Sequence, residues 1–193
     1  MALSENPPKL LSVGNLIIFY TGMTAVALIL GFVFHKNIQY IQATTLWRDL
    51  AWGIGFGVVI VGLSVSLSRN TPIFDGIHRF LRPHLGGLSM IEIILLSLFS
   101  AMGEEFFFRG FLQTSIGWIG ASLIFGLIHL GPTKEFFPWT LFALSVGLLL
   151  GYIKETSLSL TAPILIHFLV NWGNITFIVK RNSPATSHIT SPS

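Results

Sequence analysis

Apolar stretches separated by short polar segments recur along the 193-residue chain. A helix that crosses a lipid bilayer needs about 20 mostly apolar residues, so a chain of this length has room for about six crossings. The pattern therefore predicts an all-α fold, a polytopic membrane helix bundle that forms a single transmembrane domain over residues 1–193. The expected helices cover residues 16–34, 50–67, 90–111, 120–129, 136–153 and 158–179.

Residues 68–88, after the second expected helix, mix charged residues with aromatic and aliphatic ones. Such a mixture is typical of an amphipathic helix that lies in the membrane surface. This segment is interpreted either as an ordinary interfacial connector or as a substrate-gating element. Residues 1–11 form a polar lead, and residues 181–193, rich in Ser, Thr and Pro, are predicted to be disordered.

Small and aromatic residues inside the expected helices predict how these helices pack. Glycines allow a neighbouring helix to approach closely, and Gly147 and Gly151 form a G-x-x-x-G motif. We expect Tyr20 and Phe34 to lie at the membrane interfaces, where aromatic residues are enriched. Residues 115–120 are expected to form a turn that leads into the fourth helix, and residues 154–157 a short loop. The second expected helix carries four glycines, Gly53, Gly55, Gly57 and Gly62.

The composition agrees with a membrane protein and excludes several other classes. The chain is 52% hydrophobic and 10% charged, with a mean hydropathy of +0.74, whereas soluble domains are about one-quarter charged. The net charge of +3 is thinly spread, without the basic run typical of nucleic-acid binding. The absence of cysteine excludes disulfides, thiolate metal sites and cysteine catalysis. We therefore expect membrane lipids as partners and no nucleic acid.

The basic residues also predict an orientation. With six crossings, seven of them lie on the side of the chain termini and three on the opposite side. Because cytoplasmic loops carry an excess of Lys and Arg, both termini are expected in the cytoplasm. The seven are Lys9, Arg69, Arg79, Arg82, Lys134, Lys180 and Arg181; the three are Lys36, Arg48 and Lys154.

Three charged residues, Glu104, Glu105 and Arg109, interrupt the apolar run of residues 90–111. Counted from Glu92, Glu104 lies about 18 Å along a helix, more than halfway across the hydrocarbon core. A carboxylate at that depth is costly and indicates a functional site. Glu105 and Arg109 can pair across one helical turn, whereas Glu104 is rotated by about 100° and has no local partner. Alternatively, all three lie in a short interfacial loop.

Two histidines in other expected helices provide candidate partners. His129 ends the fourth helix, and His167 shares a face of the last helix with Asn171 and Asn174. By helix rise, Glu104, His129 and His167 come within about 12 to 14 Å of one membrane surface. These side chains can therefore converge, although a single histidine in a helix is more often a packing residue.

Convergence of these residues would supply the groups needed to hydrolyse an amide. A carboxylate beside a neutral imidazole can deprotonate water, and a second imidazole with a carboxamide can donate hydrogen bonds to the resulting oxyanion. The same glutamate and two histidines could instead bind a divalent metal such as zinc. Other intramembrane protease patterns are absent, because the chain contains no H-E-x-x-H, G-x-S-G or G-x-G-D motif.

Three ordered motifs resemble a known family. Residues 104–110 (EEFFFRG) fit E-E-x-x-x-R, residues 125–129 (FGLIH) fit F-x-x-x-H, and residues 167–171 (HFLVN) fit H-x-x-x-N. The chain thus resembles the CAAX prenyl protease and bacteriocin-processing family, also called the Abi or type II CAAX protease-like family, over about residues 89–174. The resemblance implies an intramembrane endopeptidase that cleaves a membrane-associated or lipidated peptide.

The resemblance also implies roles for individual residues. By motif position, Glu104 would activate the water together with His129. His167 and Asn171 would stabilise the oxyanion, and Glu105 with Arg109 would hold the architecture. The family's catalysis is either metal-dependent or of a glutamate type, so zinc, bound by Glu104, His129 and His167, is a candidate cofactor.

Other interpretations are compatible with the same residues. A non-catalytic immunity or scaffold protein would use the fold without hydrolysis, and a proton-coupled transporter would use the buried acids and histidines, although no internal repeat supports it. The predicted depth also raises a conflict. It puts the site nearer the face opposite the termini, whereas processing of prenylated proteins requires access from the cytoplasm.

Overall fold

A computed structural model of the protein describes residues 12–36 and 42–181. The polar lead, residues 1–11, and residues 182–193 of the predicted disordered tail lie outside the described residues. No β-strand occurs in the described part of the chain, which confirms the all-α prediction. Its helices are α1 (Val13–Val33), α2 (Leu46–Asn70), α3 (Asp75–Leu85), α4 (Met90–Glu105), α5 (Gln113–Ile128), α6 (Phe137–Ser157) and α7 (Thr161–Lys180).

Short segments of tighter or wider helix join these elements. The 3₁₀ turns η1 (Ala43–Thr45) and η3 (Lys134–Phe136) precede α2 and α6, and the π-helical segment η2 (Phe106–Leu112) connects α4 to α5. The expected loop at residues 154–157 is wrong, because α6 continues to Ser157 and ends at Leu158, whose φ is +55°.

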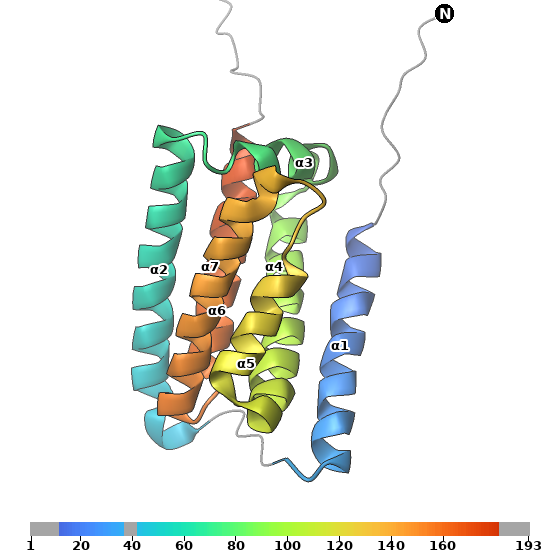
Figure 1. Cartoon of the computed structure of the whole chain (residues 1–193), viewed down its shortest axis with the longest axis vertical. Helices are drawn as coiled ribbons and strands as arrows, with labels where there is room; N and C mark the ends of the chain where they lie inside the picture. Colours follow the sequence, from blue (N-terminus) through green and yellow to red (C-terminus); the bar gives the residue numbers. More distant parts are fainter. Residues whose placement is uncertain (1–11, 37–41, 182–193) are drawn as a thin grey trace, which may run out of the picture.

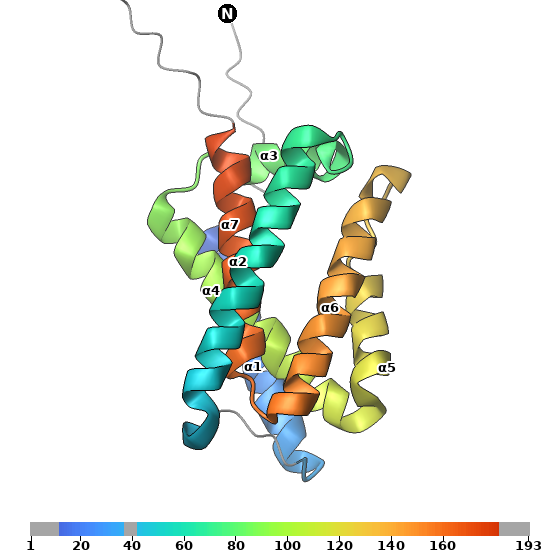
Figure 2. The same cartoon turned by 90° about the vertical axis from the view of Figure 1, so that its left-hand side faces the viewer.

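The long helices form a bundle of roughly antiparallel rods, and α3 lies across the end where α1 begins and α7 ends (Figure 1). Five stretches within the described residues are long and apolar enough to cross a membrane: 13–33, 43–70, 90–128, 134–157 and 161–180. The third, 39 residues long, folds back on itself, with α4 running away from the α3 end and α5 returning (Figure 2). The rods α1, α2, α4, α5, α6 and α7 thus correspond to the six expected helices.

The reversal between α4 and α5 has a local cause. Gly117 adopts φ 79° and ψ 165°, a conformation that glycine tolerates and residues with a Cβ rarely adopt. It lies inside the segment 115–120 where the sequence predicted a turn. The π-helical segment η2 just before it widens the helix, a distortion frequent at functional sites.

Glycines bring α2 against α7, as predicted. A Cβ on Gly53 would lie 2.7 Å from Leu165, and a Cβ on Gly57 would lie 2.7 Å from Leu169. The other two glycines predicted for this role have no neighbouring atom within 4 Å of a Cβ. Two of the four glycines therefore form the close helix contact, and the other two do not.

The predicted G-x-x-x-G motif of α6 packs against α5. A Cβ on Gly147 would lie 2.9 Å from the Phe125 ring, and one on Gly151 would lie 3.0 Å from Ser122 Oγ. The Ser122 hydroxyl donates a hydrogen bond of 2.9 Å to the Gly147 carbonyl. Close packing and this polar contact together join α5 and α6.

The helix α3 has the features of an interfacial helix. Phe74, just before α3, and Ile77 within it are buried against Phe136, whereas Arg79 and Arg82 are exposed. An apolar face on the protein and a basic face outward suit a helix lying in the membrane surface. The predicted interfacial helix after the second crossing is therefore present, with bounds narrower than residues 68–88.

Candidate active site

The two acids end α4, and the second of them pairs with the arginine of η2. Glu105 Oε2 lies 3.5 Å from Arg109 Nε, and both side chains are fully buried. Arg109 also donates a hydrogen bond of 3.1 Å to the Gly147 carbonyl, and its guanidinium lies over the Phe125 ring. The predicted pairing of Glu105 with Arg109 is confirmed, and it ties η2 to α6 and α5.

His167 of α7 lies between the two acids. Its Nδ1 is 2.8 Å from Glu105 Oε1, and its Nε2 is 3.8 Å from Glu104 Oε2. An ionised carboxylate only accepts hydrogen bonds, so Nδ1 of His167 carries the hydrogen and Nε2 is turned toward Glu104. Glu104 thus faces an imidazole of α7 at a distance longer than a direct hydrogen bond.

His129 is fixed at the end of α5 by a backbone contact. Its Nδ1 lies 2.7 Å from the Phe125 carbonyl oxygen, so Nδ1 must carry the hydrogen of this bond. In the neutral ring, Nε2 then has a free lone pair. The Phe125 ring stands beside both histidines, with centroid distances of 4.6 Å to His129 and 6.0 Å to His167.

The two asparagines of α7 have polar partners on other helices. Asn171 Nδ2 donates to the Ser100 hydroxyl at 2.9 Å, and Asn174 Oδ1 accepts from the Ser64 hydroxyl at 2.7 Å. These contacts leave the second N–H of the Asn171 carboxamide for another acceptor. The polar face predicted for α7 is therefore paired with serines of α4 and α2.

All four side chains predicted to be catalytic line one cavity of about 250 Å³: Glu104, His129, His167 and Asn171. Glu105 and Arg109, predicted to be supporting, are not among the residues that line it. The remaining polar lining is Tyr20, Ser64, Ser68, His78, Ser100 and Asn174, and the other walls are aliphatic and aromatic.

The cavity extends from the acids toward the α3 end of the bundle. Glu104 follows Met90 by 14 residues and His167 precedes Lys180 by 13, so both lie about 20 Å from that end. Ile77, Leu81 and Leu85 line the same cavity from α3. The site thus lies deep, as predicted, but the cavity leads toward the termini, which removes the conflict between its depth and access from that side.

The sequence reasoning missed Tyr20. It was expected at the membrane interface, but it lines the cavity, and its side chain approaches the Glu104 carboxylate. A Cβ on Gly103 would lie 2.8 Å from the Tyr20 carbonyl oxygen, so α1 packs tightly on α4 beside Glu104. A tyrosine in an otherwise apolar helix, and a glycine directly before the acid, were the available signals.

The predicted zinc ligands are not grouped as a metal site. Within residues 12–36 and 42–181, no three His, Asp or Glu side chains are grouped to hold an ion. Zinc bound by Glu104, His129 and His167 stays a prediction from the sequence, and the chemistry below uses only the protein's own side chains.

The fold and the cavity define a class, that of integral membrane helix bundles with an acid, two imidazoles and a carboxamide around one internal pocket. The family model described as type II CAAX prenyl endopeptidase Rce1-like matches residues 86–173, from just before α4 into α7. The uncharacterized protein YpbD of Bacillus subtilis (strain 168) is 30% identical over 152 residues, which cover 73% of this chain and 76% of the relative. No solved structure matches the chain significantly. The protein belongs to the type II CAAX prenyl endopeptidase Rce1-like family.

Proposed function

We propose that the protein is an intramembrane endopeptidase that cleaves a membrane-associated or lipidated peptide with a water activated by Glu104. The observation that carries this proposal is the common cavity of Glu104, His129, His167 and Asn171. Each of these side chains comes from a motif of the family, and each retains a polar atom that its protein partners do not occupy.

Glu104 is the base in this mechanism. Its Oε2 atom has no hydrogen-bond partner within the described residues, and the 3.8 Å to His167 Nε2 is too long for a direct bond. A water placed there can donate to Glu104, and the lone pair on Nε2 of neutral His129 offers a second acceptor at the same cavity. A carboxylate and an imidazole around one water provide general-base catalysis, typically worth about 10² to 10⁴ in rate.

His167 and Asn171 provide the oxyanion donors. In its doubly protonated form, His167 donates through Nδ1 to Glu105 and through Nε2 into the cavity. The second N–H of Asn171 is oriented by the bond from its first N–H to Ser100. Preorganised donors of this kind stabilise the charge that develops on the carbonyl oxygen during attack.

The atoms balance without a further reactant. The water oxygen adds to the carbonyl carbon while its proton passes to Glu104, and the C–N bond then breaks as Glu104 returns a proton to the amine. Glu105 and Arg109 do not touch the reacting atoms. They hold His167 in position, because Glu105 bonds to Nδ1 and Arg109 balances the charge of Glu105.

The cavity walls favour an apolar substrate segment. Half of the residues that line the cavity are aliphatic or aromatic, and the polar ones lie at the acid end and along α2 and α7, with His78 on α3. An apolar lining with a few convergent polar groups is typical of a ligand-binding pocket. The cavity reaches α3 at the membrane surface, where a lipidated peptide would be held.

The test is cleavage of a prenylated peptide by the purified full-length protein in detergent, compared between the wild type and Glu104→Gln. We expect the variant to lose at least about a hundredfold in rate. Glu135→Gln is the matched control, because Glu135 is exposed and lies outside the cavity. Equal rates for the wild type and Glu104→Gln would contradict the proposal.

A chelator separates the two chemical routes. The proposed mechanism predicts that prolonged treatment with a chelator leaves the cleavage rate unchanged. Loss of activity that zinc restores would instead favour the metal-dependent route. Retention of a cellular phenotype by Glu104→Gln, with no cleavage by the wild type, would favour the scaffold interpretation.

A further inference from the structure

Most polar side chains of the active-site cavity lie on three helices. On α2, α4 and α7 these side chains are one or two turns apart, and all of them line the cavity. Because residues four apart share a helix face, each helix turns a polar face toward the cavity. We call this set of residues the polar strip. It consists of Ser64 and Ser68 of α2, Ser100 and Glu104 of α4, and His167, Asn171 and Asn174 of α7.

The proposed function leaves Asn174 of this strip without a role. Asn174 lies one turn beyond Asn171 on α7, and its Oδ1 accepts a hydrogen bond of 2.7 Å from the Ser64 hydroxyl. A carboxamide also carries two N–H groups. Within the described residues, no protein group accepts a hydrogen bond from the N–H groups of Asn174. Ser64 therefore holds Asn174 with its donors available to a ligand in the cavity.

A peptide that is cleaved in this cavity needs partners for its main chain. In an α-helix each carbonyl oxygen accepts from the N–H four residues later, so the segment around the attacked carbonyl must be unwound. Unwinding leaves main-chain N–H and C=O groups unpaired, and each of them costs free energy in apolar surroundings. Leu16 of α1, Leu81 of α3 and Phe142 of α6 line the cavity but cannot pair with these groups. The polar strip can.

Asn174 lies where an extended main chain would pass. The oxyanion donors His167 and Asn171 precede Asn174 by seven and three residues of α7, which correspond to about 10 and 5 Å along the helix. An extended peptide advances about 3.3 Å per residue. A carbonyl group that reaches Asn174 therefore lies about two or three residues from the cleaved bond.

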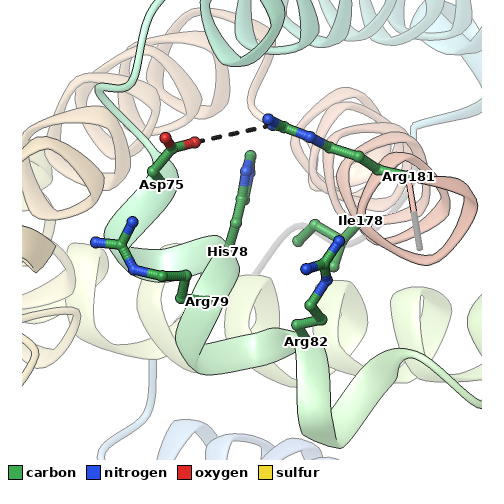
Figure 3. Close-up of a pocket in the computed structure, with 6 residues that line it drawn as sticks. All are labelled: Asp75, His78, Arg79, Arg82, Ile178 and Arg181. Carbon is green, nitrogen blue, oxygen red and sulfur yellow. Dashed lines mark ion pairs between the residues drawn. The ribbon is translucent and has the colours of Figure 1, made fainter.

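Beyond Asn174 the cavity continues to the surface end of α7. Ile178 follows Asn174 by one turn and lines the cavity together with His78 of α3. The same two residues line a small pocket of about 170 Å³ at the α3 end, where Asp75 lies 3.8 Å from Arg181 (Figure 3). A peptide that enters from this charged end would thus pass Asn174 before it reaches the acids.

We propose that Asn174 binds the substrate, donating a hydrogen bond to a main-chain carbonyl oxygen two or three residues from the cleaved bond. Ser64 is a positioning residue, because its hydroxyl orients the carboxamide. Contacts with the main chain provide affinity that depends little on the side chains of the substrate. The proposal rests on the proposed function for the presence of a peptide in the cavity.

The test measures binding of the prenylated peptide to full-length Glu104→Gln protein in detergent, without cleavage. In a series of analogues, an (E)-alkene replaces one amide at a time, which keeps the extended shape but removes the carbonyl oxygen. The alkene two or three residues from the cleaved bond should weaken binding about fivefold to tenfold, the effect of one hydrogen bond. When Asn174→Leu is added, the all-amide peptide should bind as weakly as this analogue, and the alkene should have little further effect.

Thr176→Val is the matched control, because Thr176 also lies on α7 but does not line the cavity. Added to Glu104→Gln, it should leave the binding of every analogue unchanged. Ser64→Ala should weaken binding less than Asn174→Leu, because the donors remain and only their orientation is lost.

A purely structural role of Asn174 gives different results. If Asn174 only joined α2 to α7, Ser64→Ala and Asn174→Leu would weaken binding equally, and the alkene effect would persist in both. That outcome would overturn the proposal. Equal binding of all the analogues to Glu104→Gln would also overturn it, and this comparison requires no change at Asn174.

Binding and cleavage together separate this proposal from the proposed function. An alkene effect that disappears in Asn174→Leu, with no cleavage by the wild type, would support the Asn174 contact and contradict the peptidase. Cleavage that Glu104→Gln abolishes, with equal binding of all the analogues, would overturn the contact and leave the peptidase proposal intact. Failure of the all-amide peptide to bind would contradict both.

Discussion

Removing the Arg109 side chain should destabilise the bundle strongly. Its guanidinium pairs with Glu105 at 3.5 Å, donates to the Gly147 carbonyl at 3.1 Å and lies 4.6 Å from the Phe125 ring centroid. Both partners of the ion pair are fully buried. Arg109→Met keeps most of the apolar volume but leaves Glu105 without its cation. Breaking a buried pair from one side costs about 3 to 5 kcal/mol.

A double-mutant cycle distinguishes the ion pair from simple loss of packing. Glu105→Gln alone leaves the arginine buried without a counter-charge, so we expect a similar cost. The double variant Glu105→Gln/Arg109→Met has no unpaired charge. Its cost should therefore be smaller than the sum of the two single costs by about 1 to 3 kcal/mol.

The measurement is reversible unfolding in mixed detergent micelles, followed by helical circular dichroism. The free energy of unfolding of each variant is compared with that of the wild type. A cost below about 1 kcal/mol for Arg109→Met, or strict additivity in the double variant, would refute the inference that this pair holds η2 against α6.

Three more expected outcomes follow from other contacts. Tyr20→Phe removes the hydrogen bond to the Glu104 carboxylate and should lower kcat for peptide cleavage about tenfold at constant KM, because a hydrogen bond to a charged group contributes about 1.5 to 3 kcal/mol. Phe19→Leu, on the exposed side of α1, should change neither kcat nor KM. Leu81→Trp narrows the cavity beside α3 and should raise KM severalfold, unlike Phe80→Trp on the exposed face. Burial and Arg181 lower the pKa of His78 below 6.5, and Asp75 opposes this shift; Arg79 and Arg82 line the same small pocket as His78. As the pH drops below about 6.5, the unfolded chain therefore binds a proton at His78 before the folded chain does, and the free energy of unfolding should fall. The free energy of unfolding of His78→Gln, measured over the same pH range, should not show this decrease.

Much of the fold followed from the sequence because its main determinants are local. Apolar runs predicted the six rods, and the mixture of charges and aromatic residues predicted α3. The turn at Gly117 lies within the expected turn of residues 115–120. Helix ends were less accurate, since α6 continues through Lys154 to Ser157. That last turn carries polar residues at the membrane surface, where composition no longer distinguishes helix from loop.

The sequence predicted which residues form the site, but it predicted few of the contacts between them. The spacing of Glu105 and Arg109 predicted their pairing, because partners four residues apart face each other on one helix. The contacts of His167 with both acids depend on how α7 crosses α4, which no local pattern encodes. Tyr20 was missed for the same reason, since its place at the cavity results from the packing of α1 on Gly103.

The depth of the site and the route to it are separate properties, and α3 connects them. Glu104 and His167 lie about 20 Å from the α3 end, where an unpaired charge would be costly without a wet, polar cavity. The cavity provides that environment and leads to the residues of α3 at the surface. A shift of α3 would therefore alter the cavity lining and, with it, access to the buried acids.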